Sequence, residues 1–367
     1  MATVTAIEGD ELGPSQILMV RDPRVGLEGI VVVDNVACGP AIGGIRMAPD
    51  VSLEEVRRLA RAMTLKNAAA GLPHGGGKGG IIADPGQPRD SKERLVRRFA
   101  RLIEGLDGYI PGPDMGTNEE AMAWIQDEIG RVVGLPRVVG GIPLDEIGAT
   151  GYGLAAAADV AAPRLGMDLQ GARVTVQGFG AVGIHAARFL AQRGARLVAA
   201  SDSRGATHNP DGLDLDALIA HKAQAPVSEF KGGKALPRDA LVGIDCEIWV
   251  PAARPDVLTQ ANAPELRARL VLQGANIPAT PAAERILHER GVLSIPDFIA
   301  NAGGVICASV EYHGGTESQA MATIEDKIGT NVKELLQRAD ARGELPREAA
   351  VAMARARVEE AMAYRAF

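Results

Sequence analysis

The chain has 367 residues, which is enough for two ordinary domains. Hydrophobic residues make up 46% and charged residues 23%, as in a folded globular protein. The net charge of −7 argues against nucleic acid or an anionic membrane as a partner, because both need clustered lysine and arginine. No apolar run is long enough to cross a membrane and the acidic N-terminus does not resemble a signal peptide, so a cytoplasmic protein is expected.

The first 70 residues predict two strands, a glycine-rich loop and a helix. The strands are expected within residues 17–34 and the loop at 39–49. The helix begins after Ser52, a residue whose hydroxyl can cap the first turn. Its apolar stripe continues onto Lys66, which is unusual because burying an ammonium group without a partner is costly.

A second glycine-rich segment follows this helix. We expect residues 71–80 to form a loop in which Lys78 is embedded among glycines, an arrangement that suggests a backbone packed closely against a ligand. Helices are predicted at 92–106 and 118–133, and the loop between them carries Asp114.

From about residue 148 the pattern changes to alternating strands and helices. Strands are predicted at 173–177 and 196–201, and three later apolar runs have the length of strands covered on both faces of a parallel sheet. The tail is expected to be helical, with segments near 318–338 and 346–363.

The segment GFGAVG has the spacing of a dinucleotide-binding motif, and it follows a predicted strand and opens a predicted helix. Gly178 would allow the tight turn, Gly180 the approach of a pyrophosphate, and Gly183 close packing of helix on strand. Asp202 ends the next strand and can accept hydrogen bonds from ribose hydroxyls, which favours NAD. Arg204, two residues further on, leaves NADP open as an alternative.

Two lysines and a carboxylate suggest the chemistry. Oxidising an amine to an imine and adding water needs a cation for the substrate carboxylate, a base for the water, and a group that carries the amine proton. A lysine can act as a base near neutral pH when burial and a second cation favour its neutral form. Lys66, Lys78 and Asp114 would meet these needs together.

The chain resembles the glutamate/leucine/phenylalanine/valine dehydrogenase family. The matching segments are GPAIGGIRMAP, LARAMTLKNAAAGLPHGGGKGG, GPDMGTN, ATGYG, GFGAVG, QGAN and PDFIANAGGV, which occur in family order between residue 39 and about 312. The resemblance implies reversible oxidative deamination of an L-α-amino acid to a 2-oxo acid and ammonia, with NAD as cofactor, no metal, and a homo-oligomeric assembly.

The resemblance also implies a role for each site residue. Lys66 would hold the substrate α-carboxylate, Lys78 would be the catalytic base and Asp114 the proton shuttle, while Asn301 would contact substrate or nicotinamide. Further substrate contacts are expected at Ile42, Gly43, Met63, Val305 and Ala308. Further cofactor contacts are expected at Thr150, Phe179, Ala181, Val182, Ser203, Ala252 and Asn276, beside the motif glycines and Asp202.

The implied fold is α/β, with two domains around a cleft. A substrate domain is expected at 1–135 and a Rossmann-type dinucleotide-binding domain at 136–330. The helical tail at 331–367 is expected to pack back on the substrate domain.

The side-chain pocket is predicted to be apolar. Glutamate dehydrogenases use a lysine and a serine for the substrate's second carboxylate, and the matching positions here are Ile42 and Ala308. An apolar pocket cannot compensate the desolvation of a carboxylate. The segment 309–312 has a character closer to the glutamate enzymes, and Arg46 is a spare cation, so a polar substrate stays open.

Three other functions are weighed against this one. The first is a glutamate dehydrogenase with atypical anchors, and the second is a 2-hydroxy-acid dehydrogenase, which would use a paired histidine and carboxylate. None of the six histidines stands in an evident pairing of that kind. The third is a non-catalytic nucleotide-sensing protein, which would be expected to lack a lysine or the aspartate.

Overall fold

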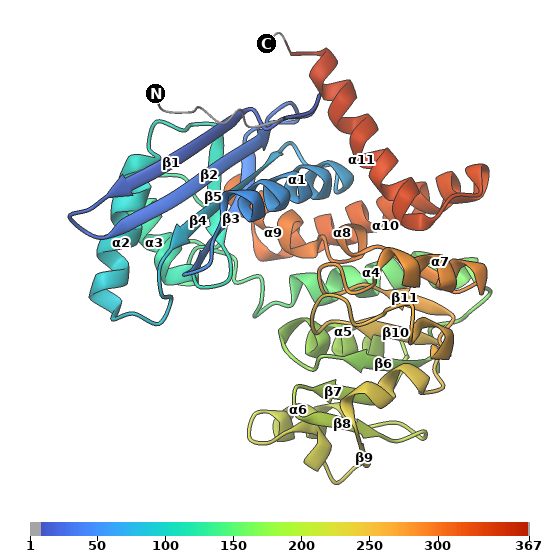
Figure 1. Cartoon of the computed structure of the whole chain (residues 1–367). Coiled ribbons are helices and arrows are strands. Elements are labelled where there is room, and N and C mark those ends of the chain that lie inside the picture. The colour runs from blue at the N-terminus through green and yellow to red at the C-terminus, as the bar shows by residue number, and fades with distance from the viewer. Residues whose placement is uncertain (1–8, 366–367) are drawn as a thin grey trace. The chain divides into compact units, whose positions relative to one another are not determined.

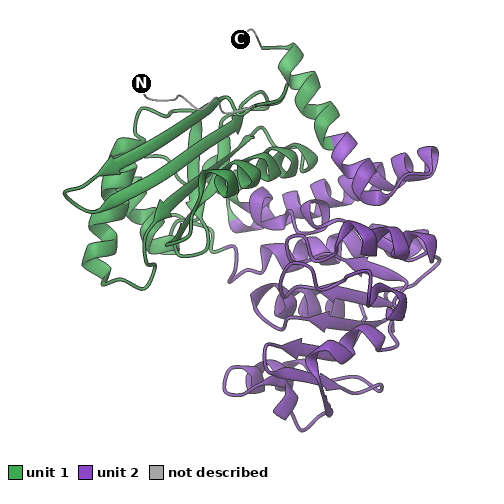
Figure 2. Ribbon diagram, in the orientation of Figure 1, with its two compact units in different colours: residues 1–143, 308–316, 354–367 green, residues 144–307, 317–353 purple. Residues whose placement is uncertain are grey.

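The computed structural model describes residues 9–365, which form two compact units. Unit 1 extends to Pro143 and also contains Ala308–Thr316 and the chain from Ala354 onward; unit 2 contains Leu144–Cys307 and Glu317–Met353 (Figure 2). The division differs from the expected one mainly in two places: Ala308–Thr316, expected in the dinucleotide-binding domain, belong to unit 1, and only the last part of the tail does. Among the described residues no helix is long and apolar enough to cross a membrane.

Unit 1 is built on a five-stranded sheet with the strand order β1-β2-β4-β3-β5 (Figure 1). β1 and β2 are antiparallel, as are β2 and β4, whereas β3 runs parallel to both β4 and β5. The elements are β1 (Gln16–Asp22), β2 (Leu27–Asn35), β3 (Ala41–Ala48), α1 (Leu53–Ala69), β4 (Gly75–Ile82), α2 (Arg89–Leu102), β5 (Tyr109–Pro113), α3 (Glu119–Ile129) and the 3₁₀ turn η1 (Arg137–Val139).

The two segments expected as glycine-rich loops are strands, β3 and β4, so that expectation was wrong. The glycines allow close protein contacts: a Cβ on Gly76 would lie 2.0 Å from the backbone nitrogen of Thr64 in α1. On the other face, a Cβ on Gly77 would lie 2.9 Å from the ring of Tyr109. The glycines therefore allow α1 and the tyrosine ring to approach the backbone of β4 closely.

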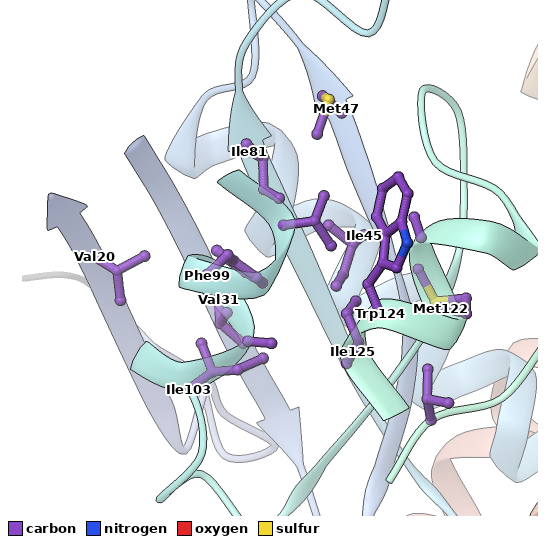
Figure 3. Packing of buried hydrophobic residues seen from close by; sticks show 14 of the residues in the cluster. Val20, Val31, Ile45, Met47, Ile81, Phe99, Ile103, Met122, Trp124 and Ile125 are labelled. Carbon is purple, nitrogen blue, oxygen red and sulfur yellow. The ribbon is translucent and has the colours of Figure 1, made fainter. Parts of the chain in front are cut away.

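The core of unit 1 lies on both faces of this sheet. On one face, Phe99 of α2 and Trp124 and Ile125 of α3 pack over Ile45 and Ile81 of the sheet (Figure 3). On the other face, Val56 and Ala60 of α1 pack on Ile30 and Val32. Burial of each large apolar side chain is worth about 1.5–3 kcal/mol, so both faces hold the strands in register.

Unit 2 contains a seven-stranded sheet with the order β12-β11-β10-β6-β7-β8-β9. The strands from β12 to β7 are parallel, and β8 and β9 add an antiparallel edge that the sequence analysis did not predict. The strands are β6 (Arg173–Gln177), β7 (Arg196–Asp202), β8 (Gly205–His208), β9 (Lys234–Leu236), β10 (Ile248–Pro251), β11 (Leu270–Leu272) and β12 (Leu293–Ile295).

The strand order of unit 2 reverses at β6, because β7 continues the sheet on one side and β10 on the other. In open α/β sheets such a reversal marks the ligand site, which lies beyond the carboxyl ends of the two central strands. The helices are α4 (Ala149–Arg164), α5 (Ala181–Gln192), α6 (Leu215–Lys222), α7 (Pro281–Glu289), α8 (Asp297–Ala300), α9 (Gly303–Tyr312), α10 (Glu317–Arg342) and α11 (Pro346–Ala363), with 3₁₀ turns η2 (Val227–Glu229), η3 (Arg238–Gly243) and η4 (Ala263–Glu265).

The last helix, α11, begins in unit 2 and ends in unit 1. In unit 1, Arg357 donates to the carbonyl oxygens of Ala68 at 3.1 Å and Ala69 at 2.6 Å. These are carbonyls of the last turn of α1; that of Ala68 also accepts from the backbone nitrogen of Gly71, and the arginine adds a side-chain cap to the end of the helix.

Candidate active site

The structure brings Lys78 and Asp114 together in unit 1. The ammonium nitrogen of Lys78 lies 2.5 Å from a carboxylate oxygen of Asp114. The lysine side chain is 9% exposed and the aspartate side chain 27%, so the pair is open to solvent mainly on the carboxylate side. A buried amine with one partly exposed carboxylate is suited to exchanging protons with a small molecule bound beside it.

Gly44 creates the space in which this pair forms. It lies on β3, the strand between β4, which carries Lys78, and β5, which precedes Asp114. A Cβ on Gly44 would lie 2.8 Å from the Cβ of Asp114 and 2.7 Å from the carbonyl oxygen of Pro113. Any larger residue at position 44 would push Asp114 away from the lysine.

The turn after β5 fixes Asp114. The hydroxyl of Thr117 lies 3.0 Å from the backbone nitrogen of Asp114 and donates to the carbonyl oxygen of Ile45 at 2.8 Å. Gly116 has φ +86°, and the backbone nitrogen of Met47 donates to the carbonyl of Met115. The turn is thus bonded to β3, and the carboxylate is presented by a rigid element.

Substitution of Gly44 by alanine should therefore reduce catalysis more than stability. Because misplacing a reacting group by about 1 Å can cost on the order of 100-fold, we expect Gly44→Ala to lower kcat about 10- to 100-fold. Gly105→Ala is the control, since a Cβ there would meet no atom within 4 Å. Steady-state rates measure the change in kcat, and the thermal unfolding midpoint measures the change in stability. An unchanged kcat in Gly44→Ala would contradict the view that the space beside Gly44 positions Asp114.

Lys66 lies in the last turn of α1 and is half-buried. The next residue, Asn67, is fully buried and its amide donates to the carbonyl oxygen of Gly75 at 2.6 Å and, weakly, to that of Ile42 at 3.5 Å. This turn of the helix is therefore fixed against the ends of β3 and β4, near the pocket residue Ile42.

The expected pocket residues Ile42 and Ala308 pack together. They form a buried apolar cluster with two residues that the sequence analysis did not identify, Ile110 and Val133. Ile42 pairs with Gly76 of β4 and with Ile110 of β5, two positions before Gly44, so the cluster adjoins the Lys78–Asp114 pair along the same strands. The other expected lining residues, Met63 and Val305, are half-buried on α1 and α9.

Two of the polar residues that left a charged substrate open, Arg46 and Glu311, have partners within the protein. Arg46 forms ion pairs with Glu55 at 3.2 Å and Asp50 at 3.7 Å. The carboxylate of Glu311 accepts three backbone N–H groups, from Gly134, Leu135 and Ile142, at 2.7–3.0 Å. Both residues therefore have structural partners within unit 1.

Gly43 is packed closely against the neighbouring strand. A Cβ there would lie 1.6 Å from the carbonyl oxygen of Gly77, and its own carbonyl accepts from the Tyr109 hydroxyl at 2.7 Å. Tyr109 is fully buried, and burial raises the pKa of its phenol, which therefore stays a hydrogen-bond donor. The pair Gly43–Tyr109 stabilises the centre of the sheet under the site.

In unit 2, the glycine motif lies at the carboxyl end of β6 as predicted. Gly178 has φ +96°, and a Cβ on Gly183 would lie 2.0 Å from the carbonyl oxygen of Gly178, so both glycines are sterically required. Gly180 meets no atom within 4 Å on its Cβ side, and no side chain caps α5 behind it. The open glycine and the uncapped helix leave room and N–H donors for a pyrophosphate.

A pocket of about 340 Å³ opens at this point, at the ends of β6, β7 and β10. It includes the expected residues Gly178, Phe179, Gly180, Asp202, Ser203 and Ala252, and also Gln177, Ser201, Ala253, Lys222, Arg238 and Arg254. Ala181, Val182 and Gly183 form the first turn of α5 behind it. Its size and its place at the strand reversal are those of a nucleotide site.

Asp202 has a partner that the sequence did not reveal. One of its oxygens accepts the ammonium of Lys222 at 2.6 Å and the N–H of Val227 at 3.1 Å, and the other accepts the N–H of Arg204. Burial by itself would raise the pKa of this carboxyl, but the hydrogen bond from Lys222 and those from the backbone outweigh it, and the pKa is lowered. The carboxylate is charged, and its charge is paired inside the protein.

Three expected nicotinamide contacts lie near one another in unit 2. The amide of Asn301 donates to the side-chain oxygen of Asn276 at 3.0 Å. A Cβ on Gly304 would lie 3.3 Å from the hydroxyl of Thr150, which places Thr150 beside the residues that follow Asn301. Spacing alone could not show this, because the three residues lie in separate segments of the chain.

Comparison with known proteins supports this reading of both units. Residues 14–131 match the Glu/Leu/Phe/Val dehydrogenase dimerisation domain, and residues 140–366 match the Glutamate/Leucine/Phenylalanine/Valine dehydrogenase domain. The chain belongs to this family. It is an NAD-dependent amino-acid dehydrogenase.

Individual members differ in substrate. The chain is 38% identical to the NAD-specific glutamate dehydrogenase of Staphylococcus aureus, over 89% of this chain and 83% of that one. It superimposes on the leucine-bound hetero-hexameric glutamate dehydrogenase of Thermus thermophilus with a TM-score of 0.85 and 34% identity, covering 96% and 90% of the two chains. It is similar also to L-tryptophan dehydrogenase of Nostoc punctiforme, with a TM-score of 0.76 and 26% identity over 96% and 98%.

Proposed function

We propose that this dehydrogenase acts on L-α-amino acids with an apolar side chain. The observation that carries the proposal is the cluster of Ile42, Ile110, Val133 and Ala308, in which each side chain is at most 6% exposed. A carboxylate moved into such surroundings loses its hydration without gaining a partner. An aliphatic or aromatic side chain gains free energy there, at about 25 cal/mol per Å² of apolar surface buried.

The acid–base chemistry is assigned to Lys78 and Asp114. After oxidation of the substrate Cα, Lys78 would take a proton from the water that attacks the iminium carbon. Asp114 accepts a proton from the substrate ammonium before oxidation and returns one to the departing nitrogen. The 2.5 Å separation lets a proton pass between the two groups within the site.

Lys66 is assigned to the substrate α-carboxylate. Its ammonium would provide the charge that every α-amino acid requires, whatever its side chain. Met63 lies one helical turn earlier on α1, and residues three apart lie on the same helix face, so Met63 would cover the apolar part of the same substrate. Val305 lies three residues before Ala308 on α9, so these two residues also share a helix face.

NAD would supply the hydride acceptor, and the residues of unit 2 would hold and orient it. We assign the pyrophosphate to Gly178, Gly180 and the first turn of α5, and the adenosine ribose to Asp202 and Ser203. Thr150, Asn276 and Asn301 are assigned to the nicotinamide end, and Ala252 to the wall of the site. These polar side chains would fix which face of the nicotinamide meets the substrate.

Lys222 bears on the choice between NAD and NADP. A carboxylate at position 202 ordinarily repels a 2′-phosphate, but here its charge is already paired with an ammonium. Arg238 and Arg254 line the same pocket, so we propose that NAD is preferred without strict exclusion of NADP. The side chain of Arg204, which first suggested this alternative, is not among the lining residues.

A substrate panel tests the proposed function. Initial rates of NADH formation are measured for the common L-amino acids, with NAD and with NADP. We expect leucine, valine, isoleucine or phenylalanine to give a kcat/KM at least about 100-fold above that of glutamate, because a site built for one polarity discriminates strongly against the other. A higher kcat/KM for glutamate would refute the apolar proposal and favour a glutamate dehydrogenase with different anchors.

The remaining alternatives lack a supporting observation. A 2-hydroxy-acid dehydrogenase would need a histidine paired with a carboxylate, whereas the ring of His74 lies 3.1 Å from the carbonyl of Pro40 and beside Tyr312 and His313. Burial lowers the pKa of His74 to about 4, which keeps the ring neutral. A non-catalytic sensor would not need the Lys78–Asp114 pair.

A homo-oligomeric assembly is part of the proposal, since the family model names a dimerisation domain.

A further inference from the structure

The short loop that carries Asn276 has a strained backbone. Ile277 has φ +49°, a left-handed conformation that β-branched residues rarely adopt, and its side chain gains little from burial because it is 52% exposed. The conformation is held by a hydrogen bond from the backbone nitrogen of Ile277 to Asp297, at 2.9 Å. Without this bond the loop would be expected to relax.

Asp297 supports Asn301 as well. The backbone nitrogen of Asn301 donates to the carbonyl oxygen of Asp297 at 2.7 Å, and the Asn301 amide then reaches the side chain of Asn276. The side chain of Asp297 thus holds the loop that carries Asn276, and its backbone carbonyl holds Asn301 in the helical turn.

Arg347, at the start of α11, holds this arrangement from behind. Its guanidinium lies 2.9 Å from the carboxylate of Asp297 and 2.8 Å from the side-chain oxygen of Gln273, the residue immediately before the loop. It also binds both oxygens of Glu284, at 2.7 and 2.8 Å. A single side chain therefore contacts both the residue that precedes the segment 274–277 and the carboxylate that accepts from its last residue.

The charges make this contact obligatory. The side chains of Asp297 and Glu284 are each 8% exposed, so removing Arg347 would leave two buried carboxylates without their cation. The planar fork of arginine can serve both carboxylates and the Gln273 amide at once, which the single ammonium of a lysine cannot.

We propose that Arg347 is a positioning residue for the nicotinamide end of the cofactor site. It touches neither asparagine. Instead, through Gln273 and Asp297 it sets the conformation of the loop that presents Asn276, and the position of Asn301. The inference rests on the proposed role of these two asparagines, and it assigns to the C-terminal helix a function in cofactor orientation.

Binding measurements without any amino acid test this proposal. NADH is titrated by fluorescence and 5′-AMP by calorimetry, because AMP occupies only the adenosine half of the site. We expect Arg347→Met to weaken NADH binding about 10-fold while AMP binding changes less than about twofold, and Arg347→Lys to give an intermediate NADH affinity. Arg355→Met is the control, because Arg355 lies on the same helix and pairs with surface glutamates.

A double-substitution cycle separates positioning from general loss of structure. Glycine adopts a positive φ without strain, so in an Ile277→Gly background the loop should depend less on Arg347, and Arg347→Met should weaken NADH binding less than about threefold. If Arg347→Met does not fold, Asp297→Asn, which keeps an acceptor for Ile277, should show the same preference for weakening NADH over AMP. Equal weakening of both ligands, or unchanged NADH binding in a folded Arg347→Met protein, would overturn the proposal. None of these outcomes depends on which amino acid is the substrate.

Discussion

Replacement of Lys78 by methionine is expected to abolish amino-acid oxidation while NADH still binds. General acid–base groups contribute about 10²- to 10⁴-fold to rates, and Lys78 would have no substitute on its strand, where its neighbours are glycines. Methionine keeps the buried apolar stem, so we expect kcat to fall at least about 1,000-fold with little loss of secondary structure. Single-turnover kinetics measure the rate of oxidation, circular dichroism the secondary structure, and an NADH titration the affinity for the cofactor.

The control for this variant is Lys333→Met, which removes an exposed lysine on α10. It should have the rates of the unmodified enzyme. If Lys78→Met retained more than about a tenth of kcat, the base would have to be another group, and the pairing of Lys78 with Asp114 would be structural only.

The second large effect is expected in the side-chain pocket. Restoring polar anchors with the double variant Ile42→Lys and Ala308→Ser should raise kcat/KM for glutamate about 100-fold and lower that for leucine by a similar factor. The physical reason is that the introduced ammonium and hydroxyl would pair with the substrate's γ-carboxylate and would be left unpaired beside an apolar side chain. Ratios of kcat/KM for the two amino acids give the result directly.

Stability provides an independent readout of the same variant. Ile42 is 3% exposed, so the introduced lysine should lower the thermal midpoint, and 2-oxoglutarate should restore part of it by binding the folded state. Ile42→Met, which changes shape but not polarity, should leave glutamate a poor substrate. An unchanged ratio of the two substrates in the double variant would mean that the cluster of Ile42 and Ala308 is not the side-chain pocket.

The reaction class and much of the local structure could be predicted from the sequence. Strand β6 and helix α5 lie where the pattern around GFGAVG predicts them, because that pattern combines strand and helix periodicities with glycines that each have a steric role. Ser52 and Asn118 cap α1 and α3 as predicted, since capping depends on residues only three apart. The two lysines at 66 and 78 and the aspartate at 114 could also be identified from the sequence as candidate site residues.

Contacts between segments that are distant in the sequence could be seen in the tertiary structure alone. Glycine is a poor strand former, so the sequence predicts loops at residues 39–49 and 71–80. Most of these residues lie in β3 and β4 instead. There the glycines allow α1 and Tyr109 to reach the backbone. Gly44, Ile110, Val133, Lys222 and Arg347 carry no local signal, since their roles arise from partners brought close by the sheet or by a distant helix. Periodicity and spacing depend on residues that are close in the sequence. A steric gap or a buried ion pair depends on residues that are distant in the sequence and close only in the folded structure.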